Sequence, residues 1–189
     1  MSDLVPPWPA KDPSFGEVFL RRFIPEDVTA VIDLSQDAYV PHIGTLPARA
    51  TRAQAQAWLE RQEQRYTDRT AFSFAMANRT TGACLGFIGL TIRELPSGRA
   101  QAGYAVAPSS RGRGVASDGL RALTTFGWTI THLHRIELFI EPWNAASIRT
   151  AERAGYEREG LLRSHQEIAG QRRDMLLYSV IRERNRPPT

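Results

Sequence analysis

"VAPSSRGRGVASDGL" spans residues 106–120 and joins an apolar segment to a segment with helical periodicity. After the turn, small or apolar residues return every three or four positions, at Ala116, Leu120, Leu123, Gly127 and Ile130. This spacing predicts an amphipathic helix with one buried face. A strand, a glycine-rich turn and a helix in succession leave backbone N–H groups aimed at a ligand, with the positive end of the helix dipole behind them. The stretch therefore predicts a site for an anion, with phosphate as its natural ligand.

The glycines of this turn suit close approach of a ligand to the backbone. Gly112 and Gly114 can adopt unusual dihedrals, and neither carries a side chain that would obstruct a phosphate. A P-loop is excluded because it needs a lysine in the turn, and Lys11 is the only lysine of the chain. A dinucleotide fingerprint would have a glycine or alanine at Ser117. On this segment alone, a basic loop that simply caps a helix remains the alternative.

Hydrophobic patterns place the turn within a mixed α/β domain. We expect strands at residues 17–23, 71–78, 83–94, 99–107, 135–141, 156–168 and 172–184, and helices at 25–38, 51–66, 116–130 and 145–155. Residues 71–107 read as an antiparallel meander, and the last two strands as a hairpin that turns at Ala169 and Gly170. Residues 39–48 read as a loop. The prediction is one domain, with a central, mostly antiparallel sheet of about seven strands flanked by about four helices.

The ends of the chain are expected to lie outside this domain. Residues 1–16 are rich in proline and polar groups and predict a flexible N-terminal arm. The domain would then span residues 17–184, followed by a short tail at 185–189.

Composition narrows the class of protein. The chain has 189 residues, 42% of them hydrophobic and 23% charged, which is enough for one compact core. No run approaches the roughly 18 apolar residues of a membrane span, and the start lacks the apolar segment of a signal peptide, so we expect a soluble cytoplasmic protein.

The single cysteine, Cys84, excludes an internal disulfide, and neither it nor the histidines suggest a metal site. The net charge of +4 fits an anionic ligand. A nucleic-acid-binding protein is the weaker interpretation, because no zinc finger or basic helix is present.

Three segments, in order, resemble one family. "RGRGVA" (111–116) resembles the [QR]-x-x-G-x-[GA] signature of the GNAT acetyltransferase superfamily. "NAASIRTAERAGYEREGLLR" (144–163) and "GQRRDMLLYSV" (170–180) are similar to segments of its ribosomal-protein N-terminal acetyltransferase (RimJ/RimL-like) branch. The resemblance covers residues 17–182 and implies a GNAT-type domain.

The resemblance implies acetyl-coenzyme A as co-substrate and no metal. It assigns the pyrophosphate to the amides of the turn and the pantetheine arm to the strand before it, at residues Ala105, Val106, Ala107, Arg111, Gly112, Arg113, Gly114, Val115 and Ala116. It puts Asn144 and Ser147 beside the pantetheine and the sulfur. From the residues alone, Asn144 could instead cap the following helix, and Ser147 could be a polar residue of its first turn.

Two departures from the family pattern bear on catalysis. Gln101 stands where many relatives have a glutamate base, and Ala151 where many have a tyrosine acid. The acid role then falls on Ser147 or a water that it orients. The base candidates are Glu141 and Glu94, although an α-amine can lose its proton to water near neutrality.

The expected activity is transfer of an acetyl group to a primary amine, on a protein N-terminus or a small molecule, by direct attack in a ternary complex. A backbone N–H at Val106 or Ala107 would bind the developing oxyanion. The loop at 39–47, with Trp58 and Trp143, is expected to form the acceptor groove. A catalytically silent acyl-coenzyme A binding module is the competing class, and a homodimer is compatible with the sequence.

Overall fold

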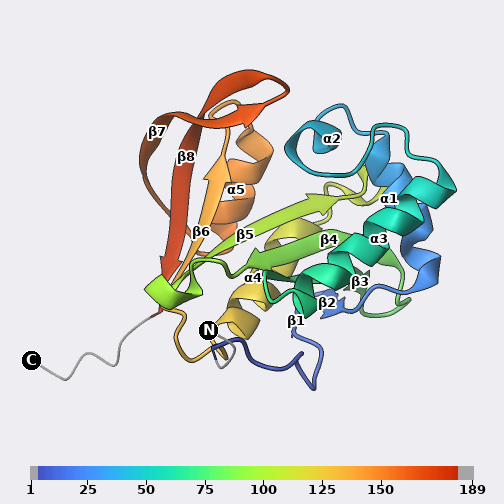
Figure 1. The fold of residues 1–189 in the computed structure, drawn as a ribbon, viewed down its shortest axis with the longest axis horizontal. Helices are drawn as coiled ribbons and strands as arrows, with labels where there is room; N and C mark the ends of the chain where they lie inside the picture. The colour runs from blue at the N-terminus through green and yellow to red at the C-terminus, as the bar shows by residue number, and fades with distance from the viewer. Residues whose placement is uncertain (1–3, 183–189) are drawn as a thin grey trace, which may run out of the picture.

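The protein folds around one twisted sheet in the computed structural model, which describes residues 4–182 (Figure 1). Its strands are β1 (Ser14–Phe15), β2 (Val18–Arg21), β3 (Ala71–Asn78), β4 (Cys84–Thr91), β5 (Arg99–Val106), β6 (Arg135–Ile140), β7 (Glu157–Ile168) and β8 (Gln171–Ile181). The α-helices are α1 (Val28–Ser35), α2 (Val40–Ile43), α3 (Arg52–Thr67), α4 (Val115–Gly127) and α5 (Ala145–Arg153), and 3₁₀ turns lie at Pro25–Asp27, Leu95–Ser97 and Pro108–Ser110. The mixed α/β prediction is confirmed, with eight strands in place of about seven.

The sheet order is β1-β2-β3-β4-β5-β6-β8-β7, and every neighbouring pair is antiparallel except β5 and β6. These two strands pair in parallel only where residues 99–101 face residues 135–137. Beyond that point they diverge, and Figure 1 shows β5 and β6 running apart toward α2 and α5. The predicted meander of β3, β4 and β5 and the closing hairpin of β7 and β8 are both confirmed.

Helices cover both faces of the sheet. Along β3, large side chains point to one face and small side chains point to the other. Phe72, Phe74 and Met76 lie in the core on the α4 side. Ser73, on the opposite side, hydrogen-bonds Gln62 of α3. The face predicted for α4 is confirmed by the complete burial of Leu120, Leu123 and Ile130, although Ile130 lies just beyond the end of the helix.

The N-terminal segment differs from the expectation of a flexible arm. Residues 4–16 are described, and the Trp8 ring packs at a tilt against Phe72 and Phe74, with ring centroids 5.8 and 4.6 Å away. The Arg22 guanidinium lies 4.2 Å from the Trp8 ring centroid, and the backbone N–H of Trp8 donates to the Tyr66 hydroxyl at 2.7 Å. With the pairing of β1 to β2, these contacts join to the core a segment whose composition predicts a flexible arm. Residues 1–3 and the predicted tail lie outside the described residues.

Residues 39–48 also differ from a plain loop, because they contain the one-turn helix α2. The Asp37 carboxylate accepts hydrogen bonds from the N–H groups of Tyr39 and Val40, at 2.7 and 2.8 Å, and so holds the start of this turn. By contrast, Thr51 caps α3 as predicted, with reciprocal bonds to Gln54.

The hairpin turn supplies a test of backbone strain. Ala169 has a φ of 51°, and a non-glycine residue in the left-handed region costs ~1–2 kcal/mol. Ala169→Gly should raise the free energy of unfolding in urea by roughly 0.5–1 kcal/mol, because the greater freedom of glycine in the unfolded chain offsets part of the gain. Ala53→Gly, at an exposed position in the first turn of α3, should instead lower it by up to about 1 kcal/mol. Equal losses in both variants would contradict the strain.

Candidate active site

The divergence of β5 and β6 opens a cavity of about 480 Å³ that gathers most of the predicted site residues. The predicted site residues that line the cavity are Ala105, Val106, Arg111, Gly112, Gly114, Val115, Ala116, Asn144 and Ser147. Ala107 and Arg113 are adjacent in the chain to lining residues and Glu141 is two residues from Trp143, but none of the three lines the cavity. The remaining lining residues come from the segment 37–43, from β5 and the ends of the anion-binding turn, and from Trp143 and the cavity-facing side of α5.

The turn before α4 presents unpaired backbone amides to this cavity. Gly112 and Gly114 have φ values of 79° and 78°, and no atom lies within 4 Å of the place where a Cβ of Gly112 would stand. No side chain caps α4 at Gly114, and the first helical bond runs from the Asp118 N–H to the Gly114 carbonyl at 3.0 Å. Within residues 4–182, the N–H groups of residues 112–117 have no partner. Such an array, with the helix dipole behind it, fits a pyrophosphate.

The arginines of the turn hold the loop in shape. The Arg111 Nε donates to the Val106 carbonyl at 3.1 Å, and the same guanidinium pairs with Asp37 at 2.6 Å. The Arg113 guanidinium donates to the Ser109 carbonyl at 3.1 Å. The backbone amides, more than these guanidiniums, are the groups left free for a ligand.

One backbone donor of β5 points into the gap between the diverging strands. The Ala107 N–H already donates to the Leu85 carbonyl of the β4 side at 2.9 Å. Because donors alternate in direction along an antiparallel strand, the Val106 N–H faces the opposite side, toward the gap. Of the two amides considered from the sequence, Val106 is therefore the one that is available.

The first turn of α5 lies across the cavity from β5. Asn144 caps this helix, since its Oδ1 accepts the Ser147 N–H at 3.0 Å, and it also lines the cavity. The capping role weighed from the sequence is therefore present, and the Asn144 side-chain NH₂ group remains without a partner among the described residues.

Sequence reasoning missed Tyr104, which lines the same cavity from β5. Its hydroxyl lies 3.5 Å from the Ser147 carbonyl oxygen, and burial raises the pKa of the phenol. The phenol therefore keeps its proton at neutral pH. The available signal was its position within the predicted strand, immediately before Ala105, the first residue expected to contact the pantetheine arm.

Glu141, a base candidate from the sequence, is 4% exposed and held from two sides. It accepts a hydrogen bond from the Tyr39 hydroxyl at 2.6 Å, and the Arg173 guanidinium lies 3.6 Å away. Tyr39 in turn lines the cavity and packs edge-on against Trp143 at 5.0 Å. The other candidate, Glu94, pairs with Arg99 at the opposite end of β5, roughly 17 Å along the strand from Tyr104, the first residue of β5 that lines the cavity.

The two tryptophans expected in the acceptor groove lie in different environments. Trp143 is 61% exposed and lines the cavity, whereas Trp58 is buried against Phe23 and Phe87.

Cys84 lies away from this cavity, and burial raises the pKa of its thiol to about 12. Among residues 4–182, no cluster of histidine, cysteine and carboxylate side chains could hold a metal ion. Of the helices in that part of the chain, none is both long and apolar enough to span a bilayer.

The fold and the cavity define an α/β domain that opens its sheet around an anion-binding turn. A model of the acetyltransferase (GNAT) domain matches residues 17–157, and the chain belongs to this family. The expectation of an N-acetyltransferase is thereby confirmed at the level of the family.

Individual relatives agree with this assignment over most of the chain. The uncharacterised N-acetyltransferase p20 of Bacillus licheniformis is 26% identical over 163 residues, 86% of this chain and 92% of p20. A putative ribosomal-protein-serine acetyltransferase from Vibrio cholerae superposes with a TM-score of 0.75 at 19% identity, over 92% of this chain and 99% of that one. Mycobacterium smegmatis RimJ, solved with a coenzyme A disulfide, superposes with a TM-score of 0.70 at 23% identity, over 87% of this chain and 81% of RimJ.

The Tyr39–Glu141 contact predicts a pH effect. Burial, together with this hydrogen bond, raises the pKa of the Tyr39 phenol above its ordinary value near 10. Above about pH 10 the unfolded chain would release this proton while the folded chain keeps it, so stability falls as the pH rises. In Tyr39→Phe the free energy of unfolding should fall less steeply between about pH 10 and pH 11 than in the wild type. Equal slopes in urea unfolding would contradict the contact.

Proposed function

We propose that this protein is an acetyl-coenzyme A-dependent N-acetyltransferase of the ribosomal-protein type, acting on a primary amine. The observation that carries the proposal is that one cavity joins two sets of free backbone donors. The unpaired amides of residues 112–117 lie at one end, and the Val106 N–H faces the gap between β5 and β6. The first set fits a pyrophosphate, and the second fits the charge that develops on an acyl oxygen.

The protein would promote this reaction chiefly by holding the two reactants in the right position. The amine nitrogen forms a bond to the acetyl carbon, the carbon–sulfur bond breaks, the amine loses a proton and the thiolate gains one. The Val106 N–H would donate to the carbonyl oxygen as negative charge develops there, a contribution of ~2.7–4 kcal/mol for one such donor. The free NH₂ group of Asn144 would orient the pantetheine amides. Proximity of the two reactants would supply ~7–11 kcal/mol more.

Two hydroxyls of the cavity are suited to protonate the leaving thiolate. Ser147 lies in the first turn of α5, and the Tyr104 hydroxyl reaches the same turn from β5. The phenol is the stronger acid of the two, which favours Tyr104 as the donor. At the acceptor end, the buried Glu141 carboxylate lies behind Tyr39 and would receive the amine proton by way of that hydroxyl or a water.

A protein or peptide N-terminus is the acceptor that we favour. The far end of the cavity is lined by Tyr39, Val40, Ile43 and Trp143, which suits an amine carried on a side chain or segment with apolar surface. Structures of similar fold include ribosomal-protein acetyltransferases. An acceptor of that kind would place the enzyme in the cytoplasm. A homodimer, and the division of the chain at residues 16 and 184, remain predictions.

Binding and turnover together test the proposal. Calorimetry with acetyl-coenzyme A should show one site per chain, and release of free thiol should be measured over a panel of peptide N-termini, polyamines and amino acids. Turnover on a peptide supports the proposed acceptor, and turnover on a small amine alone revises it. Tight binding without turnover on any acceptor would instead establish the silent binding module. Absence of binding would overturn both.

The amide cradle is tested by filling it. Gly114→Glu places a carboxylate where the pyrophosphate would lie and should weaken acetyl-coenzyme A binding more than about 100-fold, because repulsion adds to the loss of several charged hydrogen bonds. Gly170→Glu is the matched control, since Gly170 has a φ of 73° against 78° and lies in the distant hairpin turn. It carries the same backbone strain and should bind normally. Equal affinities in the two variants would rule out the cradle.

Paired substitutions separate the two proton donors. Tyr104→Phe should lower kcat by about 10²–10³-fold with little change in acetyl-coenzyme A affinity, because a general acid contributes about that much. Ser147→Ala should lower kcat by a smaller factor if the serine only orients the thioester. The reverse order, measured by thiol release at saturating substrate, would assign the proton to Ser147.

A further inference from the structure

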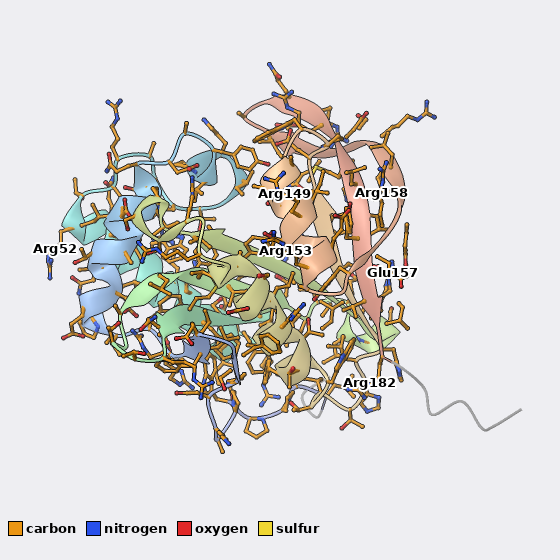
Figure 2. The ribbon with its side chains drawn as sticks, turned by 180° about the vertical axis from the view of Figure 1, so that it is seen from behind. Arg52, Arg149, Arg153, Glu157, Arg158 and Arg182 are labelled. Carbon is orange, nitrogen blue, oxygen red and sulfur yellow. The ribbon has the colours of Figure 1, made fainter. Side chains whose placement is uncertain are left out.

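Two arginines of α5 face the cavity without any protein partner. Arg149 and Arg153 line it, and neither guanidinium makes a hydrogen bond or ion pair within residues 4–182. Figure 2 shows both side chains, which are exposed to solvent, on the side of α5 that is turned toward the rest of the domain, whereas Arg52 projects outward from α3. The arginines of the anion-binding turn, Arg111 and Arg113, are by contrast both occupied.

Their position places them at the phosphate end of the cavity. Along α5, Arg149 and Arg153 lie about 3 and 9 Å beyond Ser147, in the direction that leads away from Trp143. The Arg121 Nε of α4 donates to the Arg153 carbonyl at 3.1 Å, so the end of α5 lies against the helix whose first turn carries the amide cradle. The acceptor end, at Tyr39 and Trp143, is on the other side of Ser147.

The pair is not explained by the stability of α5. Like charges four residues apart on one helix face repel each other. The negative end of the helix dipole favours Arg153 in the last turn, but it does not reach Arg149 one turn earlier. A ligand with two negative charges would offset this repulsion and meet two guanidinium forks.

We propose that Arg149 and Arg153 form a second anion subsite, which binds the 3′-phosphate of the ribose of coenzyme A. The inference rests on the proposed function. The backbone amides of residues 112–117 would hold the pyrophosphate, and the α5 guanidiniums would hold the phosphate monoester. The subsite thus selects coenzyme A over the same molecule without its 3′-phosphate.

Calorimetry with two matched pairs of ligands tests the subsite without any turnover. The wild type should bind coenzyme A at least about tenfold more tightly than 3′-dephospho-coenzyme A, as expected for one or more charged hydrogen bonds. In Arg149→Gln/Arg153→Gln this ratio should fall to near one, with the affinity for 3′-dephospho-coenzyme A unchanged. The pair 3′,5′-ADP and 5′-ADP should repeat the pattern without the pantetheine arm. Arg52→Gln, which removes one exposed arginine of α3, should keep the wild-type ratio.

Three results would overturn the subsite. They are a wild-type ratio near one, a ratio unchanged in the double variant, and an equal loss of affinity for both ligands, which would indicate a general effect of positive charge. Thermal unfolding of the double variant would show that it is folded. If neither ligand binds the wild type, the proposed function fails instead, and the two failures are thereby distinguished.

Discussion

The parting of β5 from β6 after three paired residues is the constraint on which the rest of the site depends. A strand within a sheet normally satisfies its backbone donors on both sides, and an unpaired buried donor is costly. Here β4 satisfies one side of β5, and the Val106 N–H on the other side faces a cavity. The same divergence separates α5 from the turn before α4, so that a long ligand has room to lie between them.

Contacts from the α1–α2 connection fix the width of this opening. Asp37 pairs with Arg111 on the β5 side, and the Tyr39 hydroxyl bonds Glu141 at the end of β6. Asp37 and Tyr39, which are two residues apart in the chain, thus contact opposite sides of the cavity. The segment that forms the acceptor end is in this way linked to the turn that would hold the phosphates, and any movement of one affects the contacts of the other.

Local patterns predicted much of this architecture. The cap at Thr51, the buried face of α4 and the turn at Ala169 depend on residues within a few positions, and the structure has them all. The packing of Trp8 on the core and the Tyr39–Glu141 hydrogen bond could not be predicted, because each contact joins residues that are distant in the chain. In the second case the partners are 102 positions apart, and only the folded sheet brings them together.

Both departures from the family pattern take on a different meaning in three dimensions. Gln101 lies in the short stretch where β5 still pairs with β6, so its side chain does not line the cavity. Ala151 is fully buried in the core and does not line the cavity, whereas Thr150 and Arg153 on the same helix do. Tyr104 meanwhile brings a phenol to the same turn of α5 from the opposite wall. Under the proposed function, Tyr104 would supply the proton that a tyrosine at position 151 would supply in the family pattern.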